Sequence, residues 1–190
     1  MKKVITFISG LLFLSPLLPA VASPPTQIKL ISFIQWCQQG SALSEEAGKT
    51  VSILLMQVKT TDCKQANSRL QNLTSLDLSG KQIRDLQVLG SLSHLTSLNL
   101  KNNKICDLKP LMTLTKLKKL VLTKNEIGNV CVADLEPISA LYELRELYLD
   151  DNGISNLESL STLRLKKLEV SKNPIDYQVC PIKGKSICVF

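Results

Sequence analysis

Few residues in this 190-residue sequence have side chains and spacings suited to catalysis or metal binding. The only histidine is His94, and none of the six cysteines belongs to a CxxC pair. Zinc sites and cysteine nucleophiles need partners of this kind close by in the fold. The sequence also shows no alternative nucleophile and no paired catalytic carboxylates. We therefore expect a protein that is not an enzyme and that binds no metal or cofactor.

An acidic run offers one candidate calcium site. Asp150, Asp151, Asn152 and Gly153 resemble part of a calcium-binding loop. However, Tyr148 stands where the first ligand of such a loop is required. Asn152 also has another function in the repeat described below. We therefore do not expect calcium binding.

The N-terminus has the pattern of a secretory signal peptide. Two lysines precede an apolar run, and Ala20-x-Ala22 predicts cleavage after residue 22. A retained membrane anchor is the alternative, but the run is short for a span and Pro16 and Pro19 interrupt it. The expected mature protein is one secreted or periplasmic domain of 168 residues (190 less 22), without a transmembrane segment.

Basic charge is spread along the chain instead of forming a run. The net charge of +7 becomes +5 once Lys2 and Lys3 are removed with the signal peptide. Such a distribution is typical of a solvated surface, and it also favours acidic partners such as anionic polysaccharide or a membrane surface. Nucleic acid is not expected, because only eight aromatic residues are available for base stacking.

Any binding residues must be positioned by a repeat that fills residues 73–176. Its copies begin LTSLDL, LTSLNL, LKKLVL, LRELYL and LKKLEV, at residues 73, 95, 117, 144 and 165. The spacings of 22, 22, 27 and 21 give a period of 22, with an insertion around residues 128–133. A fixed period of this length is typical of a solenoid, in which stacked copies bury the leucines that one copy cannot bury alone.

Two polar positions recur within the copies. At the ninth position an asparagine amide can satisfy the backbone of a buried turn, although the first copy has Lys81 there and must close its turn differently. The four asparagines are Asn103, Asn125, Asn152 and Asn173. Further on, an Asp or Asn is expected to be the N-cap of a short helical turn on the outer face. These four caps are Asp85, Asp107, Asp134 and Asn156.

The LxxLxLxxNxI pattern resembles that of leucine-rich repeat proteins. The 22-residue unit, with the outer half Asp107-Leu-x-Pro-Leu111, is similar to the bacterial internalin type. The resemblance implies an α/β solenoid with a parallel strand ladder on its concave side. The cysteine-containing ends, with WC, DC and CPIKGKSIC, also resemble secreted repeat proteins of cyanobacteria.

The segments on either side of the repeats are predicted to be caps. In residues 23–72, Ser44 begins a segment with apolar residues at helical spacing, and Asp62 with Gln65 resembles a capping box. Three helical pieces would cover the first leucine ring, although a separate helical binding module is the alternative. Residues 177–190 are expected to form a C-terminal cap closed by a disulfide.

Six cysteines in an exported chain indicate disulfides, and sequence alone allows 15 pairings. Position in the solenoid favours one pair within the N-terminal cap and one within the C-terminal cap. The remaining two cysteines lie in neighbouring coils, one of them in the insertion. The predicted pairs are Cys37 with Cys63, Cys106 with Cys131, and Cys180 with Cys188.

Strand residues that point away from the leucines differ from copy to copy, whereas the leucines do not. This contrast predicts a scaffold with a variable concave face, although a merely solvated surface would also vary. An aromatic residue ringed by charge is a favourable anchor, and Tyr148 should adjoin Val121, since the two lie in consecutive strands. The predicted ligand-binding residues are Asn99, Lys101, Lys119, Val121, Glu146, Tyr148, Asp150 and Lys167.

These observations predict an exported, monomeric binding module for a protein, peptide or glycan in the cell envelope or outside the cell. Five strands of about four residues give a face of only ~250 to 300 Å², whereas a protein interface needs about 800 Å² per partner. A peptide or glycan therefore fits more easily than a protein. A structural envelope protein without a specific ligand and an enzyme of unrecognised type are the alternatives.

Overall fold

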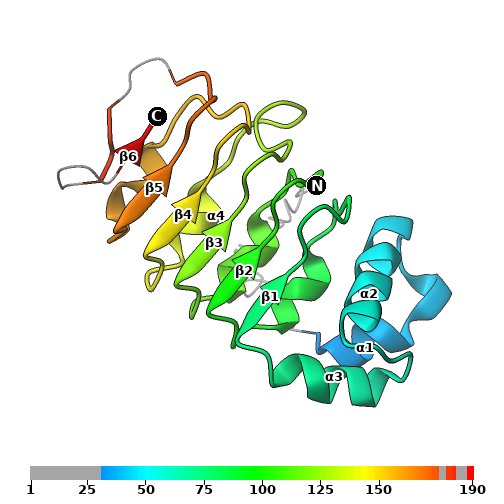
Figure 1. The fold of residues 1–190 in the computed structure, drawn as a ribbon. Helices are drawn as coiled ribbons and strands as arrows, with labels where there is room; N and C mark the ends of the chain where they lie inside the picture. Colours follow the sequence, from blue (N-terminus) through cyan, green and yellow to red (C-terminus); the bar gives the residue numbers. More distant parts are fainter. Residues whose placement is uncertain (1–30, 176–178, 183–187) are drawn as a thin grey trace, which may run out of the picture.

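Short parallel strands, stacked in chain order, form a ladder along the whole repeat region (Figure 1). The computed structural model describes residues 31–175, 179–182 and 188–190, and the sheet within them has six strands. The strands are β1 (Ser75–Asp77), β2 (Ser97–Asn99), β3 (Lys119–Val121), β4 (Glu146–Tyr148), β5 (Lys167–Glu169) and β6 (Cys188–Val189).

The middle residue of each repeat strand is a buried leucine. Leu98, Leu120 and Leu147 pair in register across β2, β3 and β4, and each is fully buried. Leu76 and Leu168 continue the row at its two ends. A fully buried leucine contributes roughly 1.5 to 3 kcal/mol, so the row is a main source of stability. The predicted stacking of leucines is confirmed.

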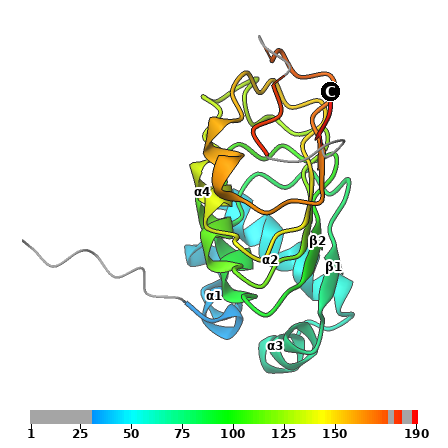
Figure 2. The ribbon, with the colours of Figure 1, turned by 90° about the vertical axis from the view of Figure 1, so that its left-hand side faces the viewer.

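Short helical turns cover the side opposite the strands (Figure 2). They are η2 (Gln87–Ser91), η3 (Lys109–Thr113), α4 (Glu136–Ser139) and η4 (Glu158–Thr162). The sequence analysis placed each N-cap one residue too early. The N-cap position is in each case the leucine that follows the predicted residue, and a leucine side chain cannot make a capping hydrogen bond. The side chains of Asp85, Asp107, Asp134 and Asn156 instead accept a hydrogen bond from the first helical N–H, at 2.7–3.0 Å.

The turn asparagines connect neighbouring coils. Asn125 donates from Nδ2 to the carbonyl of Leu122 in its own coil and to that of Leu100 in the coil before. Its Oδ1 accepts from the N–H of Ile105, also in the coil before. Because Asn103 serves the first coil in the same way, the turn at Lys81 is closed without an asparagine of its own.

Three helices, with the short turn η1 (Gly40–Ala42) between the first two, close the β1 end of the solenoid (Figure 1). They are α1 (Phe33–Gln38), α2 (Glu45–Gln57) and α3 (Cys63–Gln71). Fully buried residues such as Phe33 and Leu54 belong to the same continuous core as the repeat leucines. The helical N-terminal cap is therefore confirmed, and it is not a module with a core of its own.

The predicted capping box is only half formed. Asp62 accepts from the N–H of Gln65 at 2.6 Å, but its own N–H donates to the Thr60 hydroxyl. A complete capping box occurs instead at the start of α1, between Ser32 and Gln35. The Thr60 hydroxyl thus takes the place of the Gln65 side chain, which would complete the box by accepting from the N–H of Asp62.

All three predicted disulfides are present, and they use all six cysteines. Their Cα–Cα distances are 5.7, 5.9 and 5.7 Å, within the usual range for a disulfide. The first joins α1 to the start of α3, the second joins the second coil to the insertion in the third, and the third lies at the C-terminal end. The pairs are Cys37–Cys63, Cys106–Cys131 and Cys180–Cys188.

The C-terminal end supplies a strand that the sequence analysis did not predict. In β6, Cys188 pairs in parallel with Leu168 of β5, and Ile182 is buried against the end of the core. The predicted signal peptide (residues 1–22), residues 23–30 and parts of the C-terminal cap (176–178 and 183–187) lie outside the described residues. Among the helices that are described, none has both the length and the apolar character needed to cross a membrane.

Candidate functional site

The outward residues of the strands form two columns on the concave face. The first and third residues of each repeat strand point away from the buried leucine, and strand pairing sets them side by side in consecutive coils. We call the two sets the first and second concave columns. The first is Ser75, Ser97, Lys119, Glu146 and Lys167, and the second is Asp77, Asn99, Val121, Tyr148 and Glu169.

Tyr148 lies between two lysines from the neighbouring strands. The Nζ atoms of Lys119 and Lys167 are each 5.1 Å from the centroid of its ring, within the range of a cation–π contact. Its hydroxyl donates to Oε2 of Glu146 at 3.0 Å, and the same oxygen lies 3.0 Å from the Lys119 ammonium. Glu169 binds Lys167 at 2.7 Å. We call these five residues the Tyr148 cluster.

The charges in this cluster stabilise one another. A hydrogen bond from Lys119, and then one from Tyr148, lower the pKa of the Glu146 carboxyl. The same contact with Glu146 raises the pKa of Lys119, and Glu169 raises the pKa of Lys167. The side chains of Lys119 and Glu146 are 45% and 41% exposed, so their ion pair adds at most about 1 kcal/mol to stability. Together with the hydrogen bond to Glu146, the two lysines restrict the position of the Tyr148 ring.

The remaining predicted residues lie beside this cluster. Val121 pairs in register with Tyr148, as expected. Asn99 donates to the Asp77 carboxylate at 3.1 Å and accepts from the N–H of Lys101, so its amide already has partners. Asp150 accepts from the Thr123 hydroxyl and from the N–H of Ser171. The structure thus brings Lys119, Val121, Glu146, Tyr148 and Lys167 together, whereas Asn99, Lys101 and Asp150 are at the margins.

Two residues have contacts that the sequence analysis did not assign. Glu169 was placed on the concave face but not among the binding residues, although its position opposite Tyr148 in the repeat could have indicated it. The second is His94, whose side chain is half-buried and whose Nε2 lies 3.0 Å from the Leu70 carbonyl of the cap.

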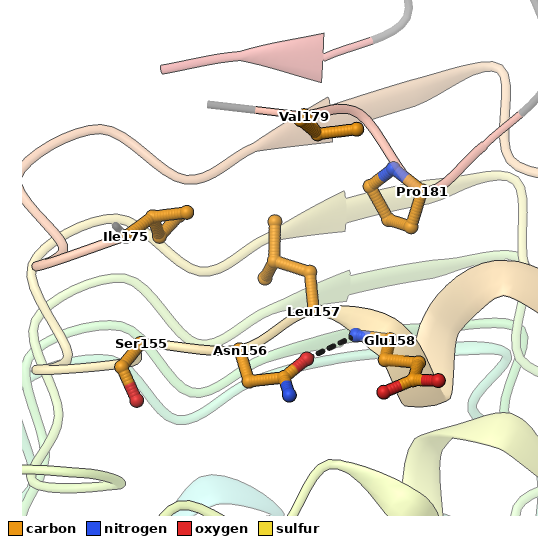
Figure 3. A pocket seen from close by; sticks show the side chains of 7 residues that line it. All are labelled: Ser155, Asn156, Leu157, Glu158, Ile175, Val179 and Pro181. Carbon is orange, nitrogen blue, oxygen red and sulfur yellow. Dashed lines mark hydrogen bonds between the residues drawn. The ribbon is translucent and has the colours of Figure 1, made fainter. Parts of the chain in front are cut away.

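One hollow away from the concave face, of about 450 Å³, lies between the coil of η4 and the C-terminal segment. Figure 3 shows Leu157 pointing into it towards Val179 and Pro181, while Ser155 and Glu158 point away. Every cysteine is in a disulfide, and the part of the chain that is described contains no group of three His, Cys, Asp or Glu residues suited to a metal.

The parallel ladder, the buried leucine row and the asparagines that link its turns define a leucine-rich repeat solenoid. A family model described as leucine-rich repeat matches residues 48–180, which is more than half of the chain. The protein belongs to the leucine-rich repeat family. Folds of this family are typically non-enzymatic scaffolds, and the architecture is that of a protein-interaction module. The comparison with curated proteins finds no match.

Among solved structures, the chain is similar to bacterial internalins. Internalin C2 of Listeria monocytogenes has 35% sequence identity and a TM-score of 0.56 over 65% of this chain and 52% of its own. A leucine-rich repeat protein of Leptospira interrogans has 31% identity and a TM-score of 0.50 over 58% of this chain and 28% of its own. Internalin InlF of Listeria monocytogenes has 20% identity and a TM-score of 0.49 over 82% of this chain and 50% of its own. The chain is internalin-like by its similarity to internalin C2, and it spans about half the length of that protein.

Proposed function

We propose that this protein is an exported binding module whose concave face recognises a protein, peptide or glycan. The Tyr148 cluster is the anchor of the site. The observation that carries this proposal is the position of the Tyr148 ring, held between Lys119 and Lys167 on a concave face whose other outward residues in β1 to β5 are polar apart from Val121.

A tyrosine held in this way suits recognition. Binding normally costs about 0.5 to 1.5 kcal/mol for each side chain that must be immobilised. Here two cations and a hydrogen bond to Glu146 already restrict the ring. Tyrosine is also one of the residues enriched in interface hot spots. The cluster therefore offers an aromatic surface that loses little freedom when a ligand binds.

The size of the face favours a narrow ligand. The sixth strand extends the sheet by one strand spacing, ~4.8 Å, which leaves the face far below the roughly 800 Å² that a standard protein interface needs. A peptide or glycan can be bound on the face alone. A protein partner must also contact the flanks, and the exposed Val130 and Val132 of the insertion are available for this.

An exported location fits the covalent structure. Three disulfides using every cysteine are typical of proteins in oxidising compartments and are rare in the cytosol. The predicted signal peptide at residues 1–22 agrees with this. We infer that the mature protein acts in the periplasm or outside the cell, as a monomer.

The test compares the mature protein with the variant Lys119→Ala/Tyr148→Ala. Glycan and peptide arrays, together with capture from a cell-envelope extract, would identify ligands of the unchanged protein. The double variant is expected to lose those ligands, whereas Tyr142→Ala should keep them. Tyr142 is a matched control because it is 65% exposed but lies in the turn before β4, off the concave face. Equal binding by all three proteins would remove the site assignment, and no ligand for the unchanged protein would favour the structural alternative.

A further inference from the structure

Three cations stand in a row along the edge of the sheet where the strands begin. Lys118, Arg145 and Lys166 each occupy the second position of a repeat, directly before β3, β4 and β5. The N–H of Arg145 donates to the carbonyl of Lys118, and the N–H of Lys166 donates to that of Arg145, at 2.9 and 2.7 Å. The three backbones are therefore stacked at the strand spacing, ~4.8 Å. We call this row the basic column.

The basic column differs from the positions on either side of it. In the first concave column, Glu146 lies between Lys119 and Lys167. The residues directly before the first leucine of each repeat form a second row, in which Glu143 lies between Lys116 and Arg164. An acid thus interrupts both neighbouring rows at the fourth coil. The basic column has no acid, and no ion pair to its three cations occurs within the described parts of the chain.

Uninterrupted like charge is unfavourable in the unbound protein. Like charges directly opposite one another on adjacent strands destabilise a sheet, and a single glutamate in the row would relieve the repulsion, as it does in the row beside it. The first two coils have Thr74 and Thr96 at this position, so the fold does not require a cation there. A ligand that brings negative charge along the row would offset the repulsion.

The central cation is already oriented. Nη1 of Arg145 donates to the carbonyls of Tyr142 and Leu144, at 3.2 and 2.8 Å. These bonds hold the guanidinium near the backbone, and its Nε and Nη2 groups have no partner among the residues that the structure describes. Arginine with free donors in a fixed plane is suited to carboxylate or sulfate oxygens.

We propose that the basic column binds a linear anionic polysaccharide that runs along the solenoid axis over the third, fourth and fifth coils. The row is one residue wide, with Glu143 and Glu146 on either side of its centre. A linear chain with regularly spaced charges fits this arrangement, whereas a flat anionic membrane would also meet the two acids. The site uses no residue of the Tyr148 cluster, so it goes beyond the function proposed above and does not depend on it.

The test measures binding of the mature protein to fluorescent heparin and to a linear polyuronate, with neutral dextran as the negative probe. The variant Lys118→Gln/Arg145→Gln/Lys166→Gln removes the column. The control Lys81→Gln/Lys124→Gln/Lys172→Gln removes the same charge from exposed lysines at the opposite ends of the strands. We expect the first variant to lose about tenfold or more in affinity and much of the salt dependence, and the control to lose clearly less.

Several outcomes would overturn the proposal. Equal losses in the two variants would mean that net charge alone attracts the polyanion. Binding to vesicles with anionic lipid but to neither polysaccharide would mean a membrane surface, and binding to no anionic probe would mean a solvated edge. The variant Lys118→Arg/Lys166→Arg keeps the positive charges of the column and should retain binding. It therefore distinguishes a loss of charge from a folding defect caused by substitution at these positions. Lys119→Ala/Tyr148→Ala should also retain it, which distinguishes this site from the concave one.

Discussion

Asn103 closes the turn of the coil before its own, where Lys81 replaces the asparagine. Its Oδ1 accepts hydrogen bonds from the N–H groups of Lys81 and Ile83, both at 3.0 Å, and its Nδ2 donates to the Leu78 carbonyl at 2.9 Å. The side chain is only 7% exposed, so water cannot replace it. A departure from the repeat in one coil is therefore compensated by the next coil.

The first prediction concerns this asparagine. Asn103→Ala should lower the free energy of unfolding by roughly 2 to 4 kcal/mol, because buried donors and acceptors in two coils lose their partners. Lys81→Asn should change it by less than about 0.5 kcal/mol, because that turn already has its hydrogen bonds. Urea denaturation followed by circular dichroism measures both. A gain of stability in Lys81→Asn comparable to the loss in Asn103→Ala would contradict the assignment.

The second prediction concerns the disulfide of the cap. Replacing Cys37 and Cys63 by serine opens a link with a sequence separation of 26 and should cost about 2 to 4 kcal/mol. Trp36, the only tryptophan, adjoins Cys37 in α1, so its fluorescence should report loosening of the cap at lower urea than circular dichroism reports unfolding of the repeats. The matched variant without Cys180 and Cys188, whose separation is 8, should leave the Trp36 signal unchanged.

The third prediction concerns protonation in the Tyr148 cluster. Lys119→Met should raise the pKa of Glu146 towards its usual value of 4.5, because the main cause of its lowered pKa is the hydrogen bond from Lys119. A carboxyl titration by NMR would measure the shift, and Lys101→Met should not produce it. An unchanged Glu146 titration in Lys119→Met would show that the pair does not form in solution.

The same shift fixes the sign of a pH effect on stability. A carboxyl whose pKa is lowered by folding stabilises the protein above its unfolded pKa, and that contribution is lost as the pH falls through the folded pKa. For the exposed Glu146 it should be less than about 1 kcal/mol, and it should be lost progressively as the pH falls below the usual value of 4.5. The stability difference between the wild type and Lys119→Met should therefore be greatest near neutral pH and small in strong acid.

The fourth prediction concerns two glycines. A side chain at Gly128 would overlap the backbone of Gly153 in the next coil, so Gly128→Ala should destabilise the protein by about 1 to 3 kcal/mol. Gly48 lies within α2 with open space around it, and Gly48→Ala should stabilise the protein by about 0.5 to 1 kcal/mol. Thermal unfolding of both variants measures the contrast. Equal effects would mean that the insertion does not lie against the following coil.

Much of the fold could be predicted because the same pattern of leucines occurs in five copies of the repeat. Each copy gives the same strand, turn and outer helix, so an error in one copy is corrected by the others. The stacked leucines followed from this period, and the disulfide between Cys106 and Cys131 followed from their places in neighbouring coils. The contact between Val121 and Tyr148 also followed, because strand register in a solenoid is fixed by the position in the repeat.

Features that occur only once could not be predicted in this way. β6 belongs to no repeat, and its short sequence has no periodic pattern to identify a strand. The bond between His94 and the Leu70 carbonyl depends on how the cap packs against the first coil. The cation–π contacts of Tyr148 depend on the side-chain conformations of Lys119 and Lys167, which strand register alone does not determine.

The insertion in the third repeat leaves the sheet unchanged. Although the spacing from the third to the fourth copy is 27 residues, Lys119 still pairs directly with Glu146. The extra residues lie to one side, and the Cys106–Cys131 disulfide ties them to the coil before. The loop at this point can therefore change in sequence and length without moving the concave face. The insertion and the concave face are thus free to diverge separately during evolution.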